Sequence, residues 1–150
     1  MATLWVNGET GPQLREWLQG DWAMLFSHPI DFQYQGLETD RWLSILREEF
    51  CAREVRPLAC ARGAREPDAG WTSQLLEDHS RLRLGSSDLA TRRLREDLTA
   101  LSTRFVVIAD ESLQRRALLK YSAGRNSVSP LDLLASIDML RRRSPARIAA

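Results

Sequence analysis

The chain alternates short apolar runs with longer segments in which hydrophobic residues recur every three or four positions. The apolar runs predict strands of a mostly parallel, buried sheet, at Thr3–Val6, Trp22–Ser27, Val55–Ala61, Arg104–Ala109 and Arg115–Tyr121. The periodic segments predict helices with one apolar face, at Pro12–Leu18, Leu37–Ala52, Trp71–His79, Asp88–Leu98 and Pro130–Leu140. Strands that alternate with helices predict an α/β domain in which helices cover both faces of a central mixed sheet.

Polar residues at the predicted helix starts support this assignment. Ser87 or Asp88 can cap the helix that follows, and Ser129 can cap the last helix. The polar, basic end of the chain, residues 141–150, predicts a frayed tail. Because the sequence shows no internal repeat and no second hydrophobic pattern, we expect one domain over residues 1–150.

Composition narrows the classes of function. A length of 150 residues with 43% hydrophobic residues is enough for one domain with a core. The net charge is +1, from 21 basic and 20 acidic residues, which argues against an extended nucleic-acid surface. No apolar run approaches the roughly 20 residues of a membrane span, and the N-terminus lacks a basic region followed by an apolar core. We therefore expect a cytoplasmic protein that binds neither nucleic acid nor membrane.

The reactive residue types are few. The two cysteines, Cys51 and Cys60, form no CxxC motif and fit a reducing compartment, where we expect both to be small core residues. The two histidines, His28 and His79, lie far apart, so they give no metal-binding constellation. No glycine-rich phosphate loop is present. We accordingly expect no bound metal and no cofactor.

The segment Gly20–Gly36, GDWAMLFSHPIDFQYQG, resembles the strand–loop–helix of the peroxiredoxins, whose loop carries a Pro-x-x-x-Thr-x-x-Cys motif. In an alignment without gaps, Pro29 matches the proline, Gln33 replaces the threonine and Gly36 replaces the cysteine that attacks peroxide. Tyr34 stands where a second proline is usual. A glycine has no side chain, so it cannot act as the nucleophile.

Four further patches carry the same resemblance, one of which consists of His28-Pro29 and Trp22 and suits the one-cysteine subgroup. Leu46–Ala61 is similar to the end of the family's helix and its next strand, and Gly124-Arg125-Asn126 is similar to the tripeptide before the last helix of the one-cysteine subgroup. Arg104–Leu119 resembles the family's strand–turn–strand, in which Arg104 aligns with the arginine that orients the reactive cysteine. The resemblance implies a thioredoxin-like fold of the peroxiredoxin type, a three-layer sandwich.

The resemblance also implies that the peroxidase chemistry is lost. Peroxide reduction needs a thiolate at a helix N-terminus, stabilised by the helix dipole and a nearby arginine. We therefore expect a catalytically inactive, peroxiredoxin-like protein that acts as a binding, regulatory or assembly module, as a homodimer or with another protein. The inherited site would contain Pro29, Gln33, Gly36 and Arg104, with His28 and Tyr34 as further candidates.

A live enzyme of the same fold is the alternative. It would perform thiol redox chemistry through Cys51 or Cys60, or non-redox chemistry in the emptied pocket around His28, Tyr34 and Arg104. An arginine beside a helix N-terminus favours anions, so a small anionic molecule is a candidate ligand.

The histidine of this loop also has two interpretations. His28 could form an acid–base pair with Asp31, three residues later, or it could fix the loop through hydrogen bonds.

Overall fold

The computed structural model describes residues 2–31, 37, 39–61, 81–85, 88–101, 104–121 and 129–142. Its elements are β1 (Thr3–Trp5), α1 (Leu14–Leu18), β2 (Trp22–Phe26), the 3-10 turn η1 (Pro29–Asp31), α2 (Thr39–Ala52), β3 (Val55–Ala61), β4 (Arg81–Arg83), α4 (Leu89–Ala100), β5 (Arg104–Ala109), β6 (Arg115–Tyr121) and α5 (Pro130–Arg142). The helix expected at Trp71–His79 lies outside the described residues.

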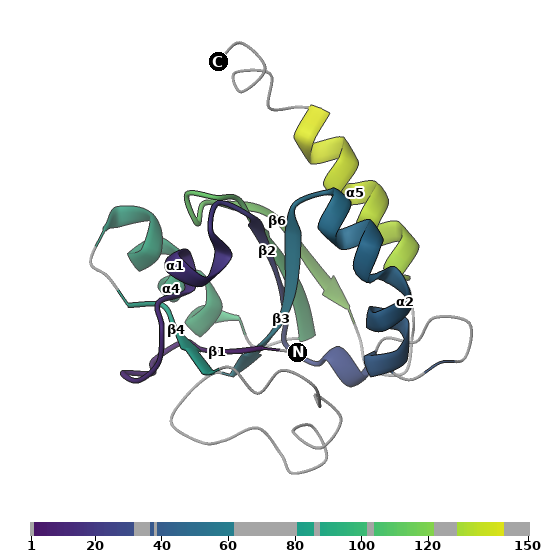
Figure 1. Cartoon of the computed structure of the whole chain (residues 1–150). Coiled ribbons are helices and arrows are strands. Elements are labelled where there is room, and N and C mark those ends of the chain that lie inside the picture. The colour runs from purple at the N-terminus through teal and green to yellow at the C-terminus, as the bar shows by residue number, and fades with distance from the viewer. Residues whose placement is uncertain are drawn as a thin grey trace.

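The strands form one mixed sheet in the order β4-β1-β3-β2-β5-β6. The strands from β4 to β2 are parallel, whereas β5 runs antiparallel to β2, and β6 antiparallel to β5. Helices α2 and α5 lie together on one side of the sheet, and α1 and α4 lie on the other (Figure 1). The predicted three-layer arrangement is therefore confirmed.

Strand β2 is covered by helices on both faces of the sheet. All five of its residues are buried, as expected for a strand covered on both faces. Its odd-numbered residues pack with α1 and α4, in a cluster that contains Ala23, Leu25, Leu14, Leu18, Leu94 and Leu98. Its even-numbered residues pack with α2 and α5, in a cluster that contains Trp22, Met24, Phe26, Trp42, Phe50, Leu133 and Ile137.

Pro57 lies inside β3, away from the strand start or bulge where a proline is expected. The amide of Ala59 donates to the carbonyl of Ala2, so the amides of this parity face β1. Pro57 has no amide hydrogen, and its backbone nitrogen would point towards β1. Strand β1 pairs with β3 only from Ala59 onwards, so no β1 residue lies opposite Pro57. The proline therefore removes no ladder hydrogen bond between these two strands.

Both helix caps agree with the sequence. Asp88 caps α4 by accepting a hydrogen bond from the Thr91 amide at 2.8 Å. At the start of α5, the Ser129 hydroxyl accepts from the Asp132 amide at 3.2 Å, and the Asp132 carboxylate accepts from the Ser129 amide at 3.1 Å. This reciprocal pair is a capping box, which satisfies two backbone donors that the helix leaves unpaired.

The last helix is longer than the sequence predicted. Helix α5 continues through Arg141 and Arg142, which were predicted to lie in a frayed tail. The guanidinium of Arg141 lies 4.3 Å from the ring centroid of Trp22 and donates to the carbonyl of Glu54 at 3.2 Å. These tertiary contacts hold the end of the helix against the start of β2. None of the helices described is both long and apolar enough to cross a bilayer.

Candidate functional site

The loop that follows β2 is fixed to the neighbouring strand by Ser27. Its hydroxyl accepts a hydrogen bond from the Phe105 amide at 2.8 Å, and its own amide donates to the Phe105 carbonyl at 3.1 Å. Phe26 pairs with Val106 in the antiparallel register of β2 and β5. Arg104, which opens β5, therefore lies beside the loop that leads from β2 to η1.

Three elements converge beyond Ser27. The Arg104 guanidinium, from β5, donates to the Asp31 carboxylate, at the end of η1, with Nη1 2.7 Å from Oδ2. The Tyr121 hydroxyl, from the end of β6, donates to the same oxygen at 2.9 Å. Arg104 and Tyr121 are direct partners in the β5–β6 register, so the hairpin places both side chains next to the carboxylate. We call Asp31, Arg104 and Tyr121 the arginine cluster.

The charges of the arginine cluster are matched internally. The side chains of Arg104 and Asp31 are 34% and 20% exposed, so the pair is partly shielded from water. Burial raises the pKa of the Tyr121 hydroxyl above its ordinary value of 10.0, and the hydrogen bond to the Asp31 carboxylate raises it further. Tyr121 is thus a neutral donor at pH 7. Asp31 therefore supplies the counter-charge of the Arg104 guanidinium.

His28 contributes hydrogen bonds to the same loop. Its ring nitrogen Nδ1 lies 2.9 Å from the Ser27 hydroxyl oxygen. Its carbonyl accepts from the Asp31 amide at 3.0 Å and from the Tyr121 hydroxyl at 3.3 Å. These contacts favour the interpretation in which His28 fixes the loop, whereas the Asp31 carboxylate serves Arg104 and Tyr121.

The remaining residues of the expected site are only partly described. Pro29 is buried at the start of η1. Gln33, Tyr34 and Gly36 lie outside the described residues, as does the segment Gly124–Asn126. Their places in the site remain predictions from the sequence.

Cys51 is exposed, so the expectation that it is a core residue is wrong. It stands twelve residues after Thr39, the first residue of α2, which is about 18 Å along a helix axis. The buried face of α2 instead carries Trp42, Leu46 and Phe50. Cys51 is therefore remote from the end of α2 that follows the loop.

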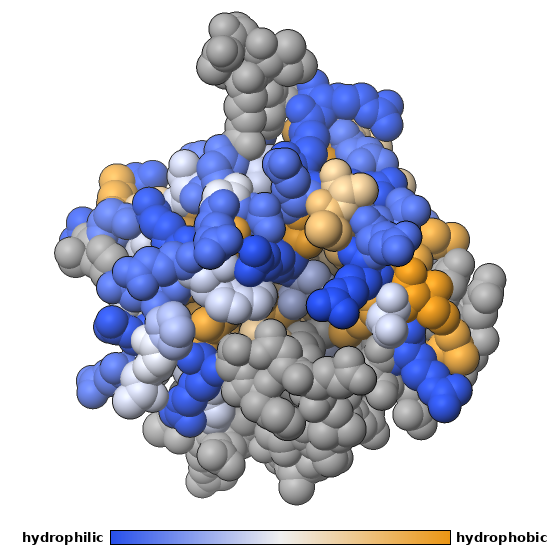
Figure 2. Space-filling view, in the orientation of Figure 1, coloured by the Kyte–Doolittle hydropathy of each residue, from blue (hydrophilic) through white to orange (hydrophobic). Residues whose placement is uncertain are grey.

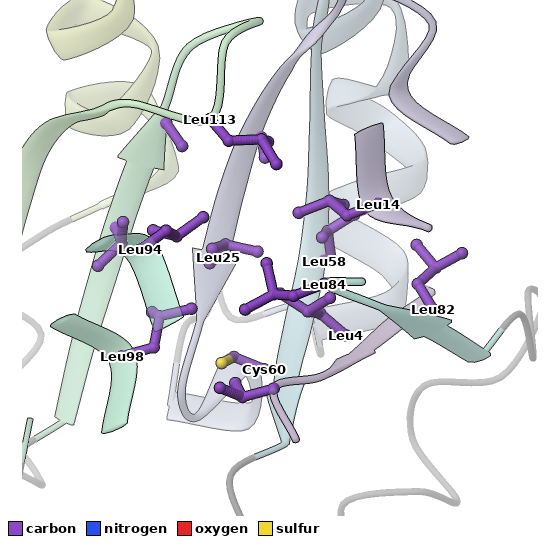
Figure 3. Close-up of a cluster of buried hydrophobic side chains, with 14 of the residues drawn as sticks. Leu4, Leu14, Leu25, Leu58, Cys60, Leu82, Leu84, Leu94, Leu98 and Leu113 are labelled. Atoms are coloured by element: carbon purple, nitrogen blue, oxygen red, sulfur yellow. The ribbon is translucent and has the colours of Figure 1, made fainter. Parts of the chain in front are cut away.

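Cys60 is buried, as predicted, with 4% of its surface exposed. Its side chain lies among leucines on the α1 and α4 side of the sheet (Figure 3). Side chains two positions apart on a strand lie on the same face of the sheet, so Arg104 lies on the face of Val106. Val106 packs with α2 and α5, on the side of the sheet opposite to Cys60. The sheet thus separates the Cys60 thiol from the arginine cluster, and neither cysteine forms a disulfide.

Sequence reasoning missed Tyr121 and considered Asp31 only as a partner of His28. The signal for Tyr121 was present, because the turn predicted between Ala109 and Arg115 places the first residue of β5 opposite the last residue of β6. Within the described part of the chain, no group of three or more His, Cys, Asp or Glu side chains is arranged to hold a metal ion.

Comparisons with known proteins place the fold. No family model matches the sequence, and no curated protein matches it. Among solved structures, the chain is similar to a reduced 2-Cys peroxiredoxin of Plasmodium vivax, with a TM-score of 0.56 and 19% identity over 87% of this chain and 83% of that one. It is also similar to thioredoxin peroxidase I of Plasmodium yoelii, with a TM-score of 0.51 and 20% identity over 87% and 79%.

A third similar structure is a cysteine-to-serine mutant of peroxiredoxin 6 from Arenicola marina, with a TM-score of 0.52 and 21% identity over 89% of this chain and 72% of that one. These likenesses confirm the predicted fold, the peroxiredoxin type of the thioredoxin-like sandwich. At such identities they concern the fold and carry no residue roles.

Proposed function

We propose that the protein is a catalytically inactive relative of the peroxiredoxins that acts by binding, as a regulatory or assembly module. The observation that supports this proposal is the position of the two thiols relative to Arg104. Arg104 pairs with Asp31 at 2.7 Å, while Cys51 stands at the far end of α2 and Cys60 lies on the other side of the sheet. With a glycine at position 36, the sequence offers no thiol where the resemblance requires one.

The chemistry explains why this loss is decisive. A thiolate must attack the peroxide oxygen, become a sulfenic acid and then be regenerated by a second thiol. Cys60, 4% exposed among leucines, is shielded from a peroxide in solution. Cys51 is accessible, but it lies near the C-terminal end of α2, whereas helices stabilise anions at their N-termini. Neither thiol has the surroundings that the reaction uses.

We propose that the ligand is a protein. A small anion would have to compete with Asp31 for Arg104, because the carboxylate already satisfies the guanidinium charge. A second copy of the chain, or another protein, requires no such exchange. We therefore propose self-association, and binding of a partner, as the protein's activity.

The inactivity is tested by stopped-flow measurement of hydrogen peroxide consumption at pH 7. We expect wild type, Cys51→Ser and Cys60→Ser to consume peroxide no faster than free cysteine at the same thiol concentration. Saturable turnover supported by thioredoxin or glutathione would overturn the proposal. The two serine variants would then identify which thiol is responsible.

A further inference from the structure

The outward face of α5 carries an apolar stripe, which we define as Leu131, Ala135 and Met139. Leu131 and Met139 are 52% and 53% exposed, and Ala135 between them is exposed as well. Positions four residues apart lie on one face of a helix. Single exposed hydrophobic residues are normal on a protein surface, but an aligned series on one helix face indicates a contact surface.

The stripe is symmetric about its centre. Leu131 and Met139 each lie four residues from Ala135, which is about 6 Å along the axis in either direction. A second copy of α5, placed antiparallel about a two-fold axis at Ala135, would bring each Leu131 against the Met139 of the other copy. The small alanine at the axis allows the two helices to approach closely. The same surface patch then serves both subunits, as a two-fold interface requires.

Charge selects the antiparallel arrangement. The first turn of α5 is acidic, with Asp132, and its last turn is basic, with Arg141 and Arg142. Antiparallel copies place each acidic start near the basic end of the other, and they also align the helix dipoles favourably. Parallel copies would bring like charges together. Arg141 is held against Trp22, so the exposed Arg142 is the basic group available to the second copy.

The neighbouring helix α2 enlarges the surface. Arg53, the residue that follows α2, and Asp138 of α5 form an ion pair at 2.9 Å. The two helices run in the same direction (Figure 1), so residues eight positions before each lie at about the same level. Ile45, 56% exposed, is therefore level with the start of the stripe. Figure 2 shows apolar side chains gathered on the side of the molecule where Figure 1 draws α2 and α5.

We propose that the stripe on α5 is a homodimer interface, paired antiparallel with α5 of a second copy about an axis at Ala135. This inference rests on the self-association proposed above and gives it a location. A standard interface buries roughly 800 Å² per partner, more than one face of a helix of this length offers, so Ile45 joins the contact and the interface belongs to the small, transient class.

Sedimentation velocity on charge variants of Ala135 tests the proposal. Ala135→Glu and Ala135→Lys each place like charges at the two-fold axis, so both variants should be monomeric where wild type is dimeric. An equimolar mixture of the two should regain the dimer, because glutamate then faces lysine. Both substitutions suit an exposed helix position, and circular dichroism will verify the fold. Leu89→Glu, at an equally exposed leucine on α4, is the matched control and should remain dimeric.

The outcomes separate this inference from the function that it builds on. If both Ala135 variants remain dimeric, the proposed α5 interface is wrong, but the proposal that the protein self-associates still stands. Single variants that are monomeric but do not recombine in the mixture would overturn the antiparallel two-fold arrangement. A monomeric wild type at high micromolar concentration would overturn both the interface and the homodimer, whereas the peroxide measurement would still decide inactivity.

Discussion

Arg104 and Asp31 form an ion pair, with Nη1 2.7 Å from Oδ2, although the two residues are 73 positions apart in the chain. The pair ties η1 to the first residue of β5, and Tyr121 ties the same carboxylate to the end of β6. The arginine that the peroxiredoxin resemblance assigns to a reactive cysteine thus has a structural partner. The sequence has a glycine, not a cysteine, at position 36, and the contact between Arg104 and Asp31 fixes the loop after β2.

Removing the counter-charge should expose the anion-binding capacity of Arg104. We expect wild type to bind small carboxylates and oxyanions weakly, since Asp31 already pairs with the guanidinium. Asp31→Asn keeps the side-chain shape, removes the negative charge and should strengthen this binding by at least about tenfold, a change that corresponds to roughly 1.4 kcal/mol. Calorimetric titration with acetate and sulfate measures the effect.

The double variant Asp31→Asn/Arg104→Ala is the control for this experiment. It should lose the gained affinity if Arg104 is the group that holds the anion. Equal binding by the single and double variants would show that the anion sits elsewhere. Strong binding by wild type would contradict the view that Asp31 occupies the guanidinium.

Tyr121 should ionise late in alkaline titrations. Its pKa is raised by burial and by the Asp31 carboxylate, so the folded state holds the phenolic proton after the unfolded chain has released it. The stabilisation is fully present below the ordinary pKa of 10.0 and is lost as the pH rises through the higher folded-state value. Phenolate absorbance of the folded protein should therefore show Tyr121 still protonated at pH 10.

Comparison of wild type with Tyr121→Phe isolates this group, because the sequence contains two tyrosines. Above pH 10, the unfolding free energy of wild type should fall more steeply than that of the variant, by up to about 1.4 kcal/mol per pH unit. Parallel pH profiles would mean that Tyr121 ionises equally in both states.

The two thiols should differ sharply in reactivity towards a water-soluble disulfide reagent. Cys51 is exposed and Cys60 is buried, so the native protein should react at about one thiol and the unfolded protein at both. Cys51→Ser should abolish the fast native reaction, while Cys60→Ser should leave it unchanged. Fast labelling of Cys60 under native conditions would contradict its place in the leucine cluster.

Arg141 should stabilise the protein more than its neighbour Arg142. It lies 4.3 Å from the Trp22 ring centroid and donates to the Glu54 carbonyl, while Arg142 is exposed at the end of α5. Arg141→Gln should lower the free energy of unfolding by about 1 kcal/mol, and Arg142→Gln by less than about 0.5 kcal/mol. Urea denaturation of both variants decides between them, and equal effects would assign the loss to charge alone.

Local sequence patterns predict the framework of the fold correctly. The bounds predicted for β3, β5 and β6 agree with the structure, because each is a run of residues suited to a strand and bounded by residues that favour turns or helix ends. Asp88 and Ser129 marked two helix starts for the same local reason. Strand bounds and helix caps can be predicted from short sequence patterns, because the interactions that form them join residues only a few positions apart.

Three other features depend on long-range contacts that local patterns do not predict. Strand β4, Arg81–Arg83, is three residues long with charged ends, so its own pattern predicts no strand, and its pairing with β1 supplies the ladder. Cys51 is exposed because α2 rotates Phe50, its neighbour, into the core, and the apolar periodicity did not fix that rotation by itself.

The arginine cluster is the third feature, and it shows which contacts the sequence did not predict. The sequence placed Arg104 at the start of a strand, but its pairing with Asp31 depends on where the loop after β2 returns to the sheet. Tyr121 reaches the same carboxylate through the β5–β6 register, from 90 positions away. The predicted turn indicated that Tyr121 lies opposite Arg104. The position of Asp31 beside both residues leaves no periodic signal in a single sequence, because packing of the whole sheet sets it.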